Sequence, residues 1–222
     1  MSSPAGTRLE HDAMGPVEVP AARLYGASTA RAVANFPFAS GPLPRPVILA
    51  MARIKQAAAR ANQCLGLLDA ERAALIQRAS QDILDGAIGM EEFPVDVFQT
   101  GSGTSSNMNV NEVVANRCAQ LARRPIGAKD PVHPNDHVNR CQSSNDVFPS
   151  AIHLAVLERL DAELAPALAL LAGELTVKAT TWSAVLKIGR THLQDATVVS
   201  IGQECGGWAA QAAQSRDRLL IA

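Results

Sequence analysis

An apolar stripe constrains the fold more than any other feature of the chain. Between positions 152 and 175, a large aliphatic residue recurs at every third or fourth place. This spacing puts the side chains on one face of a helix, so it predicts a long amphipathic helix that begins near Val147. Pro166 lies inside the pattern and should bend the helix or remove one backbone hydrogen bond. The residues of the stripe are Ile152, Val156, Leu160, Leu164, Leu168, Leu171 and Leu175.

The composition indicates that the rest of the core is also built from helices. Hydrophobic residues make up 47% of the 222 positions, but aromatic residues only 4%. A core of Ala, Leu, Val and Ile suits close-packed helices, which predicts a mainly α fold. Asp69 is a good N-cap, and Gly66 and Gly86 are good helix ends. Helical patterns occupy residues 23–36, 47–66, 68–86, 110–123 and 202–222.

Charge and hydropathy argue against several classes of protein. The formal net charge is -1 and no basic tract occurs, which makes nucleic acid and anionic membranes poor partners. The most apolar segment, residues 164–173, is too short to span a bilayer. The N-terminal residues lack the apolar region of a secretory signal. These features predict a soluble, cytoplasmic protein.

The cysteines agree with that location. They are far apart in the sequence and form no C-x-x-C pair. This spacing favours free, buried thiols in a reducing compartment over a disulfide framework or a zinc site. The four cysteines are Cys64, Cys118, Cys141 and Cys205.

Three polar loops carry the candidate chemistry. They are TGSGTSSNMN (100–109), RRPIGAKDPVHPNDHVNRCQSSND (123–146) and KIGRTHLQDATVV (187–199). Each places Ser, Thr, Asn or His close to a helical pattern, and helix N-termini attract carboxylates and phosphates. The glycines of the first loop also allow close approach of the backbone.

Each loop, taken alone, has a structural explanation. TGSGT can be a capped glycine turn, SSND an N-cap cluster, and His192 a histidine with a structural hydrogen bond. His133 and His137, with Asp136, invite a metal site, but Pro134 disfavours a regular helix there and no third histidine is near. Together the loops offer several neutral donors and one group that exchanges protons near neutral pH. That combination suits a small dicarboxylate.

The loops resemble a known family. TGSGTSSNMNVNEVVANR, VHPNDHVN, QSSNDVFPSAIH and KIGRTHLQDA are similar to consecutive blocks of class II fumarase, in the fumarase/aspartase superfamily. The resemblance runs from about Met14 to the end, with the blocks in family order. It implies a mixed N-terminal domain over residues 1–142, followed by the start of a central long-helix bundle over 143–222. It also implies a homotetramer in which copies of the bundle pack together and each active site draws on three subunits.

The resemblance implies an activity and a set of site residues. The family hydrates fumarate reversibly to L-malate in the tricarboxylic acid cycle, with no cofactor and no metal. His192 is then the catalytic acid/base. The substrate-binding residues are Ser102, Thr104, Ser143, Ser144, Asn145 and Thr191.

The resemblance also implies a second, peripheral dicarboxylate site. Its residues in this chain would be His133, Asn135 and Asp136. The family often has a basic residue nearby, where this sequence has Asp130. Lys129 is the candidate to replace that basic residue.

One family block does not occur in the 222 residues. The loop Gly-Ser-Ser-x-Met-Pro-x-Lys-x-Asn-Pro supplies the family's proton-abstracting serine, so we expect a truncated chain that is inactive alone. Aspartase is the alternative within the superfamily, but it has glutamine at the position of His192 and Ser-Thr-Asn-Asp in place of SSND. A truncated paralogue without catalytic activity is the second alternative.

Overall fold

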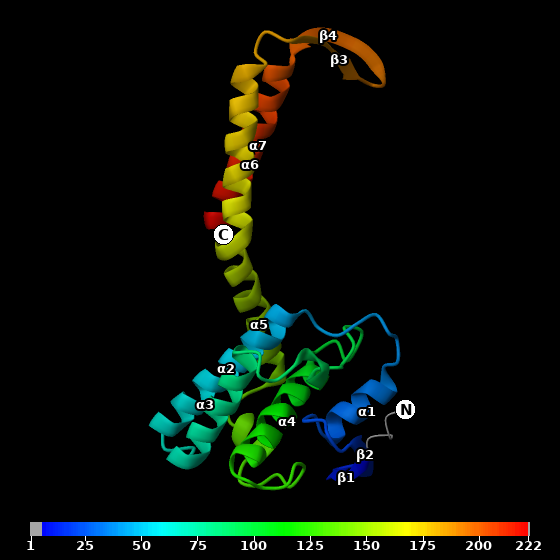
Figure 1. The fold of residues 1–222 in the computed structure, drawn as a ribbon, viewed down its shortest axis with the longest axis vertical. Coiled ribbons are helices and arrows are strands. Elements are labelled where there is room, and N and C mark those ends of the chain that lie inside the picture. Colours follow the sequence, from blue (N-terminus) through cyan, green and yellow to red (C-terminus); the bar gives the residue numbers. More distant parts are fainter. Residues whose placement is uncertain (1–5, 222) are drawn as a thin grey trace. The chain divides into compact units, whose positions relative to one another are not determined.

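The computed structural model describes residues 6–221, which fall into two compact units. Within the described residues, the units are 6–155 and 156–221, and helix α5 (Ser144–Arg159) begins in the first and continues into the second. Each unit is described by itself, and Figure 1 shows the elements of both. The predicted domain boundary between residues 142 and 143 stays a prediction.

The first unit packs four helices beside a small hairpin. Helix α2 packs against α3, α3 against α4, and α1 also packs against α4. Asp69 caps α3 as expected, because its carboxylate accepts the N–H of Arg72 at 2.9 Å. Gly66 and Gly86 follow α2 and α3 in the left-handed conformation, with φ of 70° and 77°. The elements are β1 (Thr7–Asp12), β2 (Gly15–Pro20), α1 (Ala27–Asn35), α2 (Arg45–Cys64), α3 (Ala70–Leu84) and α4 (Thr104–Leu121).

The core of the first unit is aliphatic, as the composition predicts. Its largest apolar side chains come from α2, α3 and α4 and from the segments that follow α3 and α4. The described elements are mostly helices, with two small hairpins, so the prediction of a mainly α fold is confirmed. The fully buried apolar residues include Ile48, Met51, Ile76, Ile83, Phe93, Val110, Val113, Val114 and Val132.

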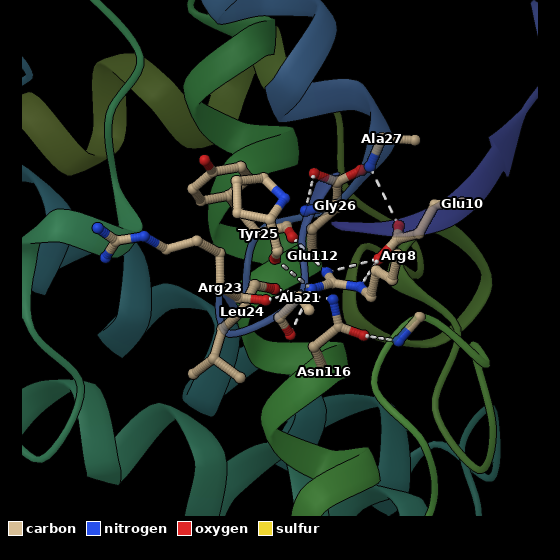
Figure 2. Close-up of polar contacts among 12 residues, drawn as sticks. Arg8, Glu10, Ala21, Arg23, Leu24, Tyr25, Gly26, Ala27, Glu112 and Asn116 are labelled. Carbon is tan, nitrogen blue, oxygen red and sulfur yellow. Dashed lines mark hydrogen bonds and ion pairs between the residues drawn. The ribbon is translucent and has the colours of Figure 1, made fainter. Parts of the chain in front are cut away.

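A buried carboxylate on α4 holds the start of α1 (Figure 2). Glu112 accepts the N–H groups of Gly26, Ser28 and Thr29 at 2.8 to 3.0 Å. These are N–H groups that a helix N-terminus leaves unpaired, and the carboxylate matches their partial positive charge. A Cβ on Gly26 would lie 2.7 Å from an oxygen of Glu10, so a larger residue there would displace this carboxylate.

Arg8 fastens the segment before α1 to β1, as Figure 2 also shows. Its guanidinium pairs with Glu10 at 2.6 Å. It also donates to the carbonyl oxygens of Pro20, Arg23 and Tyr25 at 2.6 to 2.9 Å. Asn116 of α4 also donates to the carbonyl oxygen of Leu24 at 2.8 Å, so the segment between β2 and α1 is held by β1 on one side and by α4, the helix that follows TGSGT, on the other.

The second unit consists of two long helices and a hairpin. Helix α7 runs back beside α6, and the β3–β4 hairpin joins them (Figure 1). The predicted long helix is present, but it starts at Ser144 and is interrupted by a π-helical turn. Pro166, the second residue of α6, follows that turn directly, so the disturbance of the backbone ladder lies where proline predicts it. The elements are the π-helical turn Leu160–Leu164, α6 (Ala165–Thr181), β3 (Leu186–Thr191), β4 (Gln194–Ser200) and α7 (Ile201–Ile221).

The second unit buries small residues and exposes large ones. Gly202 lets the start of α7 approach α6 so closely that a Cβ would overlap the carbonyl oxygen of Ala179. No helix within residues 6–221 has the length and apolarity needed to cross a membrane. The buried residues are Ala165, Ser200, Gly202, Cys205, Ala209 and Ala212. The exposed large ones include Val156, Leu157, Leu164, Leu170, Leu171, Val177 and Trp208.

Two sequence predictions are wrong. The third polar loop is the β3–β4 hairpin, because β-branched residues on both sides of a two-residue turn favour paired strands. All four cysteines are free, but only Cys118 and Cys205 are buried. Cys64 ends α2 and Cys141 lies in a turn. Both are exposed because the connections between helices run over the surface.

Candidate functional site

The structure brings the first two polar loops together through their hydroxyl groups. Thr104 Oγ1 lies 2.8 Å from Ser144 Oγ and 3.0 Å from Ser102 Oγ. Thr104 is the first residue of α4 and Ser144 the first of α5. We call Ser102, Thr104 and Ser144 the hydroxyl cluster. It places three neutral hydrogen-bonding groups at two helix N-termini, which favour anions.

Gly103 allows the contact between Thr104 and Ser144. It has φ of 69°, a left-handed conformation that glycine adopts readily, and it directly precedes α4. A Cβ at this position would overlap the ring of Phe148 in the first turns of α5. The second glycine of TGSGT therefore allows the start of α4 to lie against α5.

Ser143 and Asn145 flank the cluster, and Ser143 has a structural role. Its carbonyl oxygen accepts the N–H of Val147 at 2.9 Å, and its hydroxyl oxygen accepts the N–H of Asn145 at 3.3 Å. Ser143 therefore caps α5, as the alternative interpretation of SSND proposed. The side chain of Asn145 is exposed beside it.

His133 and Asn135 line a pocket of about 320 Å³ in the first unit. His133 Nδ1 accepts the N–H groups of Asn135 and Asp136 at 3.3 Å, so this histidine caps the π-helical turn Pro134–Val138. The same nitrogen lies 3.3 Å from the Asp136 carboxylate. While the nitrogen accepts hydrogen bonds it carries no proton, so the contact is not an ion pair in that state.

The charged side chains that line this pocket are those of Asp12, Glu112 and Lys129. Lys129 lines it, and its Nζ donates to the carbonyl oxygen of His11 at 2.7 Å. Asp130, in contrast, pairs with Arg124 at 3.3 Å. Lys129 is thus available at the pocket wall, and the charge of Asp130 is matched by an arginine.

The metal interpretation of this loop gains no support. Within residues 6–221, no group of three His, Cys, Asp or Glu side chains is placed to hold a metal ion. His137 Nδ1 accepts the N–H of His133 at 2.8 Å. Burial, and to a lesser extent the nearby Arg72, lowers the pKa of His137.

Thr191 and His192 lie in the second unit, at the tip of the β3–β4 hairpin. His192 and Leu193 form the two-residue turn and have φ of 49° and 63°. Positive φ at both positions is the type I′ geometry of tight hairpins. Both Thr191 and His192 are exposed, so the imidazole lies at the surface of the hairpin tip.

The sequence interpretation missed a buried lysine next to the hydroxyl cluster. Lys55 on α2 is fully buried, and its Nζ donates to Asn107 at 2.8 Å, Gln142 at 2.9 Å and Asn139 at 3.0 Å. Burial lowers the pKa of Lys55 to about 7. A helical pattern could have found it, because Lys55 is four residues before Ala59, a buried position on the same face.

Comparison with known proteins gives one family and several close relatives. A family model described as "Lyase" matches residues 15–222. "Fumarate hydratase class II 2" of Bradyrhizobium diazoefficiens is 49% identical over 216 residues, which is 97% of this chain and 46% of that protein. The chain therefore spans less than half the length of this curated relative.

Several solved structures are similar to the chain, including two with TM-scores of 0.88 or more. One is "fumarate lyase:delta crystallin" from Brucella melitensis, with a TM-score of 0.89 and 43% identity over 96% of this chain and 50% of that one. The other is class II fumarase from Schistosoma mansoni, with a TM-score of 0.88 and 40% identity over 96% of this chain and 44% of that one.

Proposed function

The chain belongs to the lyase family, and from this premise we propose that the complete polypeptide is a fumarate hydratase. It adds water reversibly to fumarate and forms L-malate. The relative from Bradyrhizobium, at 49% identity, bears that name. The observation that carries the proposal is the contact of Thr104 with Ser102 and Ser144, which joins two sequence blocks at two helix N-termini.

The hydroxyl cluster suits a substrate with two carboxylates. Hydroxyl groups of Ser102, Thr104 and Ser144 donate hydrogen bonds without bringing a fixed positive charge, and helix N-termini add partial positive charge. When the carbon next to a carboxylate loses its proton, that carboxylate gains negative charge. Donors placed beforehand stabilise this charge more than they stabilise the ground state. Ser143, Asn145 and Thr191 are proposed as further substrate ligands.

His192 is the proposed acid/base that handles water or hydroxide. An imidazole exchanges protons near neutral pH, and hydroxide leaves more easily when it is protonated. Aspartase, by resemblance, has glutamine here, since an amine that is already protonated leaves as ammonia without further help. The histidine therefore favours hydration over ammonia elimination.

The proposed assembly follows from the exposed face of the second unit. Leu170, Leu171 and Val177 are large apolar residues that α6 leaves exposed. Burying such a face releases free energy, so we propose that copies of the chain pack as a homotetramer through residues 143–222. Residues 1–142 form the N-terminal domain in this proposal. A cytoplasmic location and a role in the tricarboxylic acid cycle complete it.

The pocket at His133 is the proposed peripheral dicarboxylate site. His133 and Asn135 line its wall, Asp136 lies next to them, and Lys129 supplies positive charge. The Gly-Ser-Ser-x-Met-Pro-x-Lys-x-Asn-Pro loop does not occur among the 222 residues. We therefore propose that these 222 residues are inactive unless the rest of the site is supplied.

The experiment compares the complete polypeptide on L-malate and on L-aspartate. We expect fumarate from malate and no ammonia from aspartate. Thr104→Val removes the central hydroxyl of the cluster and should lower kcat/KM by roughly a hundredfold. Thr197→Val on the exposed surface of β4 is the matched control and should keep wild-type rates. Ammonia release without malate turnover would contradict the proposal.

A further inference from the structure

The inference concerns the contacts of Lys55. This residue is 0% exposed, yet its Nζ meets three side-chain amide oxygens, those of Asn107, Asn139 and Gln142. We call these three residues the amide cluster. An ammonium group has three N–H donors, and the amide cluster supplies one acceptor for each. The protonated lysine is therefore fully hydrogen-bonded inside the protein.

Members of the amide cluster are close in sequence to members of the hydroxyl cluster. Asn107 comes three residues after Thr104, and its N–H makes a helical hydrogen bond to Gly103 at 3.0 Å. Gln142 comes two residues before Ser144. One ammonium group thus connects the first turn of α4 to the segment that leads into α5. The contact between Thr104 and Ser144 is a second connection between the same two segments.

The segment that Lys55 holds is strained. Cys141 lies between Asn139 and Gln142 of the amide cluster. Its backbone has φ of 58°, a value that residues other than glycine adopt rarely. Such a conformation persists only where its surroundings fix it. Besides Lys55, Asn107 donates to Asn139 at 3.0 Å, and Asn62 of α2 donates to the carbonyl oxygen of Arg140 at 3.0 Å.

Burying a lysine in a protein core is energetically unfavourable. Moving an ammonium group out of water costs several kcal/mol, and an apolar side chain of similar size avoids that cost. Among residues 6–221, no carboxylate is paired with Lys55 to offset it. What the ammonium provides, and methionine would not, is three directed bonds to two separate segments.

We propose that Lys55 is a positioning residue for substrate binding, because it fixes the segment from Asn139 to Gln142, which leads into α5, against the first turn of α4. This inference rests on the proposed function of the hydroxyl cluster. Without the ammonium, the turn around Cys141 relaxes and Ser144 moves away from Thr104. The substrate then loses ligands that must be held together.

The test uses the complete polypeptide with Lys55→Met, which keeps the volume and removes the three donors. Hydrogen exchange is measured at the amides of residues 145–147, and KM and kcat are measured with L-malate. We expect exchange at these amides to become at least tenfold faster and KM to rise about tenfold, a change worth about 1.4 kcal/mol of binding. Met51→Ala, one turn earlier on α2 and also fully buried, is the control for general loss of stability.

Gln142→Met is the second variant, in case Lys55→Met does not fold. It removes one acceptor of the amide cluster and should change both measurements in the same direction by less. The inference is overturned if either measurement stays at the wild-type value in every variant that folds, or if Met51→Ala changes both as much as Lys55→Met. If the wild-type polypeptide does not hydrate fumarate, the proposed function fails, and the exchange rates alone decide whether Lys55 fixes the turn.

Discussion

The two units of this chain bury different kinds of side chain. The first unit encloses large apolar residues such as Ile76 and Phe93, together with charged groups whose hydrogen bonds are satisfied. The second unit packs α6 against α7 through small residues such as Ala209 and leaves residues such as Leu170 exposed. The first unit thus has its own hydrophobic core. The second presents an apolar surface that further helices can cover, as the proposed tetramer requires.

The largest expected effect comes from comparing a buried position of the first unit with an exposed position of the second. Ile76→Ala, at a fully buried position of α3, should lower the free energy of unfolding by about 2 to 5 kcal/mol, because it removes apolar contacts and leaves a cavity. Leu170→Ala, at a position 68% exposed on α6, should change it by less than about 0.5 kcal/mol while the chain is monomeric. Urea unfolding of the 222-residue chain at low concentration measures both. Equal losses would contradict the contrast between the units.

A second comparison is between a buried carboxylate of the first unit and a partly exposed carboxylate of the second. Glu112→Gln keeps the shape of the side chain that holds α1 but removes the charge that accepts three N–H groups. It should cost about 2 kcal/mol of unfolding free energy, the scale for hydrogen bonds to a buried charged group. Glu204→Gln removes the partner of Lys187, a partly exposed pair in the second unit, and should cost less than about 1 kcal/mol. A larger loss at Glu204 would reverse the expected order.

The labelling rates of the cysteines test how tightly the two units are packed. Burial raises the pKa of Cys118 to about 12, so this thiol carries no charge at pH 8 and is also shielded. Iodoacetamide should label the exposed Cys64 and Cys141 within minutes and leave Cys118 unlabelled. Cys205, buried between α6 and α7, should react faster than Cys118 because the second unit opens more easily. Mass spectrometry of labelled peptides measures the rates, and earlier labelling of Cys118 than of Cys205 would contradict this order.

The smallest expected effect is a pH dependence that belongs to the first unit. The backbone N–H of Arg72, and then its guanidinium, lower the pKa of Asp69 below 3.8. Because the folded pKa is the lower one, the unfolded chain takes up the proton first as the pH falls. The stabilisation is therefore complete above the unfolded pKa and is lost as the pH falls through the folded pKa.

Asp69→Asn is the control for this effect, since asparagine also caps helices but does not titrate. The difference in unfolding free energy between the wild type and this variant should shrink as the pH is lowered from about 5 to about 2. A difference that stays constant over this range would show that the carboxylate charge contributes nothing at the cap.

Local patterns predicted most of the fold. The start of α3 and the ends of α2 and α3 were predictable because aspartate and glycine act on their own neighbours, as Asp69 and Gly86 do. The β3–β4 hairpin was missed because its turn is His192-Leu193 rather than the usual asparagine or glycine pair. The exposure of Cys141 was missed for a similar reason, since it depends on a turn that distant side chains hold.

The sequence predicted the residues of the candidate site, but it did not predict the buried side chains that hold them in place. TGSGT and SSND were identified from composition and family resemblance, and the structure brings Thr104 and Ser144 together. Lys55 was missed because its partners lie 52 to 87 positions away in the sequence. A contact over such a separation leaves no local pattern, apart from a charged residue on a face that is otherwise apolar.

Our central proposal is that the hydroxyl cluster and the imidazole of His192 act on one substrate and that, in the proposed homotetramer, different copies of the polypeptide supply them. Complementation tests it most directly. Ser144→Ala and His192→Asn variants of the complete polypeptide, each weakly active alone, are unfolded, mixed and refolded together. The account predicts that the mixture hydrates fumarate much faster than either variant refolded alone. A mixture no faster than the average of the two variants would contradict it.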